Sequence, residues 1–206
     1  MIDKKELDRA FDERFAPEIK AKLQAARVAV AGLGGLGSNI AVMLARSGVG
    51  HLKLVDFDTV DTTNLNRQMY GIPHLGRFKT DAIRDILADI NPYLDIETVC
   101  VTVTPRNAAE LFGGWPIVCE AFDRPENKAM LVSTLLAECP RTTIVSGIGM
   151  AGYGDANDIR TTRRMSRLYV CGDGETAAGG TTGLLAPRVA VCAGHQANKV
   201  IQLILQ

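Results

Sequence analysis

The chain has 206 residues, 47% of them hydrophobic, and its 23 lysine and arginine residues balance 23 aspartate and glutamate residues. Such a length and apolar content suit one α/β domain with a full core, and the balanced charge indicates neither a nucleic-acid nor a membrane surface. No apolar run approaches the roughly 20 residues that span a bilayer. The first residues also lack the apolar core of a signal peptide. We therefore expect a cytoplasmic protein with no membrane or nucleic-acid partner.

The N-terminal segment, residues 1–25, is expected to be helical from residue 3 onwards because apolar residues recur every four positions among many charges. Pro17 should divide it into two shorter helices. The segment must pack on its own sheet or on a partner subunit. Simple packing is the plainer interpretation, and the alternative hypothesis is that Arg14 reaches a neighbouring active site and meets phosphate there.

A small apolar stretch at residues 28–31 runs straight into glycines, which is typical of a buried parallel strand. Gly32, Gly34 and Gly37 have the G-x-G-x-x-G spacing, in which glycines allow a tight turn, close approach of phosphate and close packing of the next helix. After that helix, a second strand ends in Asp56, about 20 residues past the glycines, where an acid can accept ribose hydroxyls. This β-α-β unit predicts a nucleotide-binding sheet without specifying the nucleotide.

A polar segment, residues 57–68, then follows the carboxyl end of that second strand, the edge where open α/β sheets bind ligands. It contains Asp58, Asn64 and Arg67, and the planar guanidinium of Arg67 suits phosphate. Lys79 opens the next helix, where a cation does not favour the helix itself. A bound anion would explain this lysine, and the alternative is a solvated surface lysine.

Further strands are expected over residues 93–103, 116–121 and 143–146, with two weakly strand-like pieces between residues 159 and 170. Asp123 leaves the second of these strands at the edge that also holds Asp56. Taken alone, Asp123 is most simply an N-cap for the helix over residues 125–138. Its position beside the other charged residues favours a role in the site.

Three later segments complete the prediction. The basic cluster at residues 160–164 is either a solvated face or a surface for an acidic partner, and the sequence does not decide between them. Residues 171–182 have the composition of a mobile loop. A terminal helix is expected over residues 187–205, with Pro187 in its first turn. Because the five cysteines include no C-x-x-C pair, we expect neither a disulfide framework nor a zinc site.

Five motifs stand in register: Gly32-x-Gly34-Gly35-Leu36-Gly37-Ser38, Val55-Asp56-Phe57-Asp58, Asn64-Leu65-Asn66-Arg67-Gln68, Gly76-Arg77-Phe78-Lys79 and Asn91-Pro92. Glu120-Ala121-Phe122-Asp123, Ala186-Pro187 and Gln196-Ala197 add to them, so the similarity covers about residues 20–206. Together they resemble the E1-like activating superfamily, and in particular its short ThiF-like members, which are similar to the thiamin and molybdopterin sulfur-carrier activating enzymes. The resemblance implies a single adenylation domain over residues 1–206. Its fold would be Rossmann-like, with a mostly parallel sheet extended by C-terminal strands and a terminal helix.

The activity that this resemblance implies is an ATP- and Mg²⁺-dependent adenylation. The acceptor would be the C-terminal glycine carboxylate of a small ubiquitin-like sulfur carrier ending in Gly-Gly, and pyrophosphate would be released. The product would serve thiamin biosynthesis or a related sulfur-transfer pathway. Because relatives bury a large shared face and borrow an arginine across it, a homodimer is also implied.

Carried over position by position, the resemblance gives each motif a role. The glycines Gly32, Gly34, Gly35 and Gly37 would cradle the nucleotide, and Asp56 would hold the ribose. Asn64, Arg67 and Lys79 would hold the triphosphate, Asp123 would bind magnesium beside the α-phosphate, and Asp58 would assist the metal or order the loop. A carboxylate that attacks a phosphate is an anion meeting an anion, so cations must be placed where charge develops. Arg67, Lys79 and the metal on Asp123 are therefore the predicted catalytic groups.

The sequence departs from the family pattern in two places. No cysteine stands near residue 179, where the sulfur-relay cysteine of the thiamin enzyme would fall. Cys171 is the nearest candidate thiol, although a structural cysteine is the simpler interpretation. Arg124 follows Asp123 where an asparagine is common in the family, and it offers a further phosphate contact.

Three other functions fit parts of the sequence. A related enzyme could adenylate a different acyl substrate such as a modified tRNA base, although the balanced charge argues against RNA. An NAD-dependent oxidoreductase explains the β-α-β unit but leaves Arg67, Lys79 and Asp123 without a role. A non-catalytic scaffold is disfavoured because it would need none of those charges.

Overall fold

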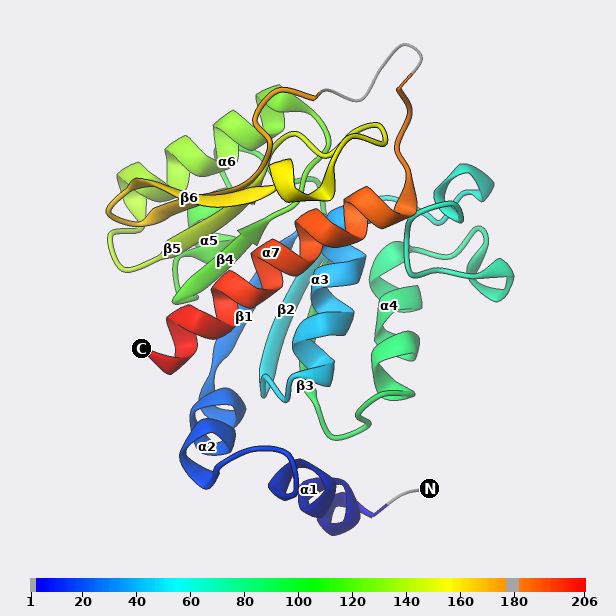
Figure 1. Cartoon of the computed structure of the whole chain (residues 1–206), viewed down its shortest axis with the longest axis vertical. Coiled ribbons are helices and arrows are strands. Elements are labelled where there is room, and N and C mark those ends of the chain that lie inside the picture. The colour runs from blue at the N-terminus through cyan, green and yellow to red at the C-terminus, as the bar shows by residue number, and fades with distance from the viewer. Residues whose placement is uncertain (1–2, 177–181) are drawn as a thin grey trace.

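The structure is a computed structural model, and it describes residues 3–176 and 182–206. A seven-stranded sheet with the order β3-β2-β1-β4-β5-β7-β6 forms its centre (Figure 1). The strands are β1 (Arg27–Ala31), β2 (His51–Asp56), β3 (Asp95–Cys100), β4 (Ile117–Glu120), β5 (Thr143–Gly147), β6 (Arg160–Met165) and β7 (Leu168–Gly172). All neighbours are parallel except β6, which runs antiparallel to β7 along one edge. The predicted fold class is confirmed.

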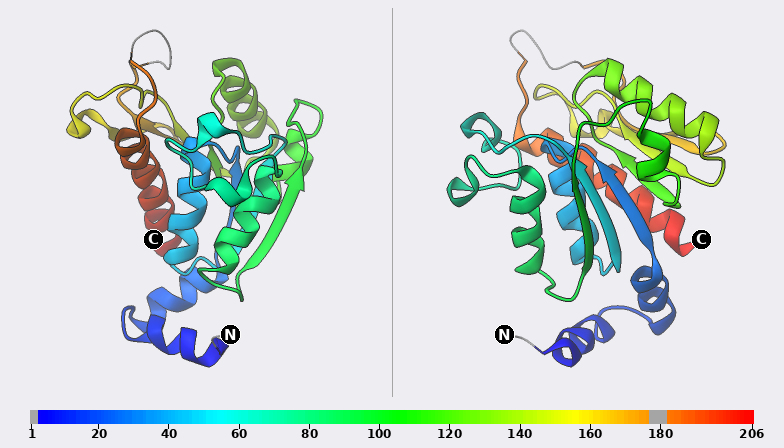
Figure 2. Two further views of the ribbon diagram at one scale, coloured as in Figure 1. Left: turned by 90° about the vertical axis from the view of Figure 1, so that its right-hand side faces the viewer. Right: turned by 180° about the vertical axis from the view of Figure 1, so that it is seen from behind.

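Helices cover both faces of this sheet (Figure 2). They are α1 (Lys4–Asp12), α2 (Pro17–Ala25), α3 (Gly35–Arg46), α4 (Lys79–Ala88), α5 (Ala108–Phe112), α6 (Pro125–Glu138) and α7 (Ala186–Leu205), with short 3-10 turns η1 (Thr62–Asn64), η2 (Ile72–His74) and η3 (Ala156–Asp158). The apolar side chains of α3, α4 and α7 share one core with one face of β1 and β2. Those of α5 and α6 share a second core with the other face. Burial of these two cores is the main force that holds the layers together.

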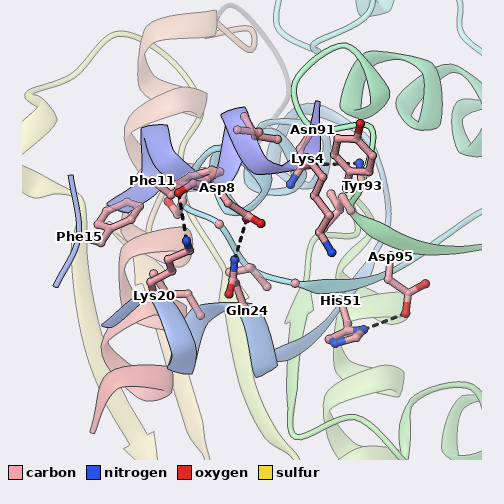
Figure 3. A pocket seen from close by; sticks show the side chains of 17 residues that line it. Lys4, Asp8, Phe11, Phe15, Lys20, Gln24, His51, Asn91, Tyr93 and Asp95 are labelled. Atoms are coloured by element: carbon pink, nitrogen blue, oxygen red, sulfur yellow. Dashed lines mark hydrogen bonds and ion pairs between the residues drawn. The ribbon is translucent and has the colours of Figure 1, made fainter. Parts of the chain in front are cut away.

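The N-terminal segment folds as its sequence predicts, because it divides into two helices at Pro17. It lies beneath the amino ends of the strands (Figure 1). A cavity of about 300 Å³ separates this segment from the turns before β2 and β3. In Figure 3, Phe11 and Phe15 line this cavity, and His51 pairs with Asp95 at its rim at 2.8 Å. The cavity is thus at the opposite edge of the sheet from the glycine-rich turn.

Two glycines stand at positions where a side chain would not fit. Gly32 has φ +91°, and a Cβ there would lie 2.9 Å from the carbonyl oxygen of Ala121. A Cβ on Gly37 would collide with the carbonyl oxygen of Gly32. The tight turn after β1 and the close seat of α3 on the sheet therefore depend on these glycines.

The structure corrects the loop expected over residues 171–182. Cys171 and Gly172 belong to β7, which pairs with β5 and β6, so the beginning of that segment is ordered sheet. Asp173 then accepts hydrogen bonds from the backbone of Glu175 and Thr176 at 2.8 and 2.9 Å. Residues 177–181 lie outside the described residues. The strand predicted over residues 93–103 is also longer than the observed one, since β3 covers only Asp95–Cys100.

Among the described residues, no helix is both long and apolar enough to cross a membrane.

Candidate nucleotide-binding site

The predicted site residues follow the carboxyl ends of parallel strands. The glycine-rich turn follows β1, Asp56 ends β2, and Asp123 comes three residues after the end of β4. Since β1 lies between β2 and β4, these three ends are neighbours at one edge of the sheet. The stretch from Asp58 to Lys79 extends from the same edge. Open α/β sheets usually bind ligands in a crevice outside this edge, and we refer to this edge as the crevice.

Asp56 is fixed against the glycine-rich turn. Its carboxylate accepts hydrogen bonds from the backbone N–H of Leu33 at 2.6 Å and of Asp58 at 2.8 Å. The turn is also tied to β2 by a bond from Gly32 N–H to the carbonyl of Val55 at 2.8 Å. Burial raises the pKa of Asp56, while the positive charge of Lys79 and these two hydrogen bonds oppose the rise. Asp56 is 8% exposed, so it has a fixed orientation at the turn where a nucleoside would lie.

Lys79 is buried rather than solvated, so the surface-lysine alternative is wrong. It is the first residue of α4 and is 5% exposed. Its ammonium lies 2.9 Å from the Asp58 carboxylate, and its backbone N–H donates to the Asp58 carbonyl at 2.9 Å. These two bonds hold the lysine inside the crevice. A buried ammonium with a single half-exposed carboxylate partner retains capacity for a further anion.

Arg67 lies over the beginning of α3. A Cβ placed on Gly35 would be 3.5 Å from the Arg67 side chain. The Asn39 side chain donates to the carbonyls of both Gly35 and Arg67, at 2.7 and 3.1 Å, and so joins the two segments. The Arg67 guanidinium donates to the Thr63 carbonyl at 3.0 Å and is partly exposed. The aliphatic part of the Arg67 side chain therefore lies beside the N-terminus of α3, the positive end of the helix dipole, where anions bind.

Asn64 has a local structural task as well as its predicted one. Its side-chain oxygen accepts from the backbone N–H of Asp61 at 3.1 Å, while the Asp61 carboxylate accepts from Thr63 N–H at 2.8 Å. This reciprocal pair is the capping box of η1. Its contact with a triphosphate stays a prediction.

Asp123 does not cap α6, so the capping alternative is wrong. The N-cap position of α6 is Arg124, and no side chain caps the helix there. Asp123 is exposed, and within the described part of the chain its carboxylate has no hydrogen-bond or ion-pair partner. A free carboxylate at this edge is available to a ligand.

A buried acid that sequence reasoning had quoted only as part of a motif supports the Asp123 turn. Glu120 is fully buried and binds the Lys128 ammonium with both oxygens at 3.0 Å. It also accepts from Phe122 N–H at 2.7 Å and from the Ser146 hydroxyl at 2.5 Å. Four charge-assisted bonds therefore fix the backbone directly before Asp123. The spacing of Glu120 and Lys128 along the chain carries no helical or strand signal that would have predicted this pair.

Two further side chains, for which the sequence predicted no role in the site, brace the crevice. The Tyr70 hydroxyl donates to the Leu33 carbonyl at 2.9 Å, and burial raises the pKa of this tyrosine. The Gln196 amide donates to the carbonyls of Glu120 and Val145 at 3.1 and 3.0 Å, and so ties α7 to β4 and β5. Nothing in the sequence around Tyr70 indicates this role. Gln196 lies in the predicted terminal helix, where a buried polar side chain needs hydrogen-bond partners.

No cluster of three or more metal-binding side chains occurs in residues 3–176 and 182–206. Among the described residues at this edge, Asp123 offers a carboxylate without a protein partner to the predicted magnesium ion, whereas the Asp58 carboxylate is paired with Lys79. Mg²⁺ commonly takes one or two carboxylates and completes its shell with substrate phosphates and water. The free carboxylate of Asp123 fits that mode of binding.

Cys171 is not a mobile thiol. It is fully buried in β7, 3.4 Å from the Thr161 hydroxyl, and burial raises its pKa. The structural interpretation of this cysteine therefore agrees with its surroundings. Arg14 lies in the connection between α1 and α2, at the opposite end of the sheet from the crevice (Figure 1). Its action in a neighbouring subunit stays a prediction.

The ThiF family model matches residues 7–206. The adenylyltransferase and sulfurtransferase UBA4 of Eremothecium gossypii is 36% identical over 136 residues, which are 66% of this chain and 30% of that protein. The tRNA threonylcarbamoyladenosine dehydratase of Haemophilus influenzae is 35% identical over 141 residues, which are 67% of this chain and 52% of that protein. The chain thus spans about a third to a half of these relatives.

Solved structures share the fold. The crystal structure of Escherichia coli tRNA N6-threonylcarbamoyladenosine dehydratase in complex with ATP has a TM-score of 0.87 at 22% identity and covers 99% of this chain and 96% of that one. The structure of Escherichia coli MccB with ATP has a TM-score of 0.69 at 24% identity and covers 91% and 59%. With the family match over nearly its whole length, the chain belongs to the ThiF family.

Proposed function

We propose that this chain adenylates a carboxylate with ATP and releases pyrophosphate. The observation that carries the proposal is the gathering of a glycine-rich turn, two cations and one free carboxylate at a single edge of the sheet. Asp56 would hold the ribose, with the glycine turn and the N-terminus of α3 against the phosphates. An NAD-dependent oxidoreductase would use only the first part of this arrangement.

The chemistry explains why cations are needed. The attacking carboxylate and the α-phosphate are both anions, and negative charge moves to the leaving pyrophosphate. Arg67 and Lys79 would bind the triphosphate and stabilise that charge from fixed positions, which costs no reorganisation during the reaction. A magnesium ion, when bound, supplies further charge neutralisation beside the α-phosphate, and Asp123 would hold it. Because the nucleophile arrives ionised, no general base is required.

We infer that the acceptor is the C-terminal glycine of a ubiquitin-like sulfur carrier ending in Gly-Gly, as the five sequence motifs imply. The similarity to UBA4, whose name describes an adenylyltransferase and sulfurtransferase, supports this choice. The pathway would be thiamin biosynthesis or a related sulfur transfer. A homodimer accompanies this proposal, and sedimentation of the purified chain checks it.

A second candidate is the adenylation of another acyl group, and one observation favours it. The alignment with the dehydratase structures covers 99% of this chain and 96% of theirs, so the two folds have nearly the same extent. Those proteins are named as dehydratases of N6-threonylcarbamoyladenosine, a modified adenosine in tRNA. The net charge of zero argues against a large RNA surface on this chain.

Exchange of labelled pyrophosphate into ATP distinguishes these functions. The protein is incubated with magnesium, ATP and a purified carrier ending in Gly-Gly, with a carrier lacking the last two glycines as the matched control. Exchange that requires the intact C-terminus supports the proposal. Exchange with threonylcarbamoyl-modified tRNA but not with the carrier supports the second candidate. No exchange with either, together with tight NAD binding, contradicts both and supports an oxidoreductase.

A further inference from the structure

Asn66 stands between the predicted triphosphate ligand Arg67 and a distant segment of the chain. Its side-chain oxygen accepts a hydrogen bond from Nη1 of Arg67 at 2.8 Å. Its side-chain nitrogen donates to the carbonyl oxygen of Leu184 at 3.0 Å. Both ends of the amide are therefore used, and the second bond reaches a residue 118 positions away in sequence.

The segment contacted by Asn66, residues 182–185, crosses the same edge of the sheet before it enters α7 (Figure 1). Its other side is held by a bond from Gly152 N–H to the Gly183 carbonyl at 2.9 Å. Leu184 packs against the core that α3 and α7 share, whereas Leu185 is 44% exposed. The segment thus connects the loop after β5 with Asn66, two residues beyond η1, and Leu185 gives it apolar surface exposed to solvent.

We propose that Asn66 is a positioning residue that couples Arg67 to residues 182–185, so that nucleotide bound at the glycine turn fixes this segment for the acyl substrate. The inference rests on the proposed function, since it assumes that Arg67 meets the triphosphate. Asn66 itself touches neither reactant.

The physical reason lies in side-chain freedom. Asn66 is exposed, and a hydrogen bond between exposed, mobile side chains contributes little because water competes and ordering costs entropy. When phosphate oxygens hold the Arg67 guanidinium, part of that entropy has already been lost. The Arg67–Asn66 bond and the Asn66–Leu184 bond then persist together. Such coupling is reciprocal, so the position of residues 182–185 also affects nucleotide affinity.

Hydrogen–deuterium exchange tests this coupling without any acyl substrate. The probe is α,β-methylene-ATP with magnesium at saturating concentration, and the readouts are a peptide covering residues 182–188 and one covering the glycine turn. In the wild-type protein the probe should slow exchange in both peptides. Asn66→Ala, which removes both bonds, should keep the protection of the glycine turn and lose most of the protection at residues 182–188.

Asn66→Asp separates the two bonds. An aspartate keeps the oxygen that accepts from Arg67 but loses the donor to Leu184, so it should behave like Asn66→Ala at residues 182–188. Asn91→Ala is the matched control, because Asn91 lies at the opposite edge of the sheet and binds the backbone N–H of Tyr93. In pyrophosphate exchange, both Asn66 variants should raise KM for the acyl substrate about five- to tenfold, the value of one hydrogen bond.

Two results would overturn the inference. One is wild-type protection of residues 182–188 in Asn66→Asp. The other is a raised KM for ATP in Asn66→Ala with unchanged protection, which would mean that Asn66 only orients Arg67. If the probe protects neither peptide in the wild-type protein, nucleotide binding itself fails, and that outcome contradicts the proposed function as well.

Discussion

Replacing Arg188 by methionine should destabilise the loops at the crevice edge. Arg188 is 5% exposed, its Nη2 lies 2.5 Å from the Asp173 carboxylate, and its Nη1 donates to the Asp155 carbonyl at 2.6 Å. One side chain therefore joins α7 to the loops after β5 and β7. Methionine fills similar volume but makes neither bond.

The size of the stability loss depends on which polar groups the Arg188→Met change leaves without a partner. Removing one partner of a buried ion pair typically costs about 3–5 kcal/mol. Here Asp173 keeps three other hydrogen bonds, from Glu175 N–H, Thr176 N–H and the Thr176 hydroxyl, which lowers the cost. The variant also removes the buried Nε of Arg188, which has no hydrogen-bond partner. We expect a loss of about 2–3 kcal/mol, or roughly 5–10 °C in Tm for a chain of this size.

The assay is urea unfolding followed by circular dichroism, with the double variant Arg188→Met/Asp173→Asn as the matched comparison. Because the double variant leaves no buried unpaired charge, it should regain at least about 1 kcal/mol relative to Arg188→Met. An Arg188→Met protein as stable as the wild type would refute this reasoning. So would a double variant that is less stable than the sum of its single changes predicts.

The Arg188–Asp173 pair also makes the stability of the folded protein depend on pH. Burial alone would raise the pKa of Asp173, but hydrogen bonds from the Thr176 and Glu175 backbone, the Thr176 hydroxyl and Arg188 outweigh it and lower the pKa to about 2, from an ordinary value of 3.8. A lowered native pKa contributes stability that is complete above the unfolded-state value and is lost as the pH falls through the native one. Wild-type stability should therefore decline between about pH 4 and pH 2 more steeply than that of Asp173→Asn.

Three further outcomes are expected. Gly37→Ala should cost about 2–3 kcal/mol in urea unfolding because its Cβ would collide with the Gly32 carbonyl; unchanged stability would contradict the close seat of α3. Lys79→Met should fold normally by circular dichroism yet lower pyrophosphate exchange about 100-fold or more, since a fixed cation is lost, whereas normal exchange would remove Lys79 from the site. Iodoacetamide should label the exposed Cys100 in the native protein and reach buried Cys171 only after unfolding; rapid native labelling at Cys171 would show that β7 is not formed as described.

Local chemistry made much of the fold predictable. The glycine spacing after residue 31 and the break at Pro17 depend on neighbours in sequence, and both were expected from them. The edge that gathers Asp56 and Asp123 was also predictable, because parallel strands place their carboxyl ends together.

What could not be predicted depends on segments that meet only after folding. Asp123 had the sequence context of a helix cap, and its free carboxylate shows only in the finished turn. Cys171 stood before Gly172 in a glycine-rich segment, and pairing with β5 turns that position into strand. The bond between Asn66 and Leu184 joins residues 118 positions apart, a separation at which no periodicity gives a signal.

The central claim is that Asp123 holds the metal at a triphosphate bound by Arg67 and Lys79. The most direct measurement is a magnesium titration of pyrophosphate exchange for the wild type and for Asp123→Asn, with whichever acyl substrate supports exchange. We predict that the Asp123→Asn variant binds ATP but catalyses pyrophosphate exchange at least about 100-fold more slowly at the wild-type magnesium optimum. Equal rates with the same magnesium dependence would contradict it.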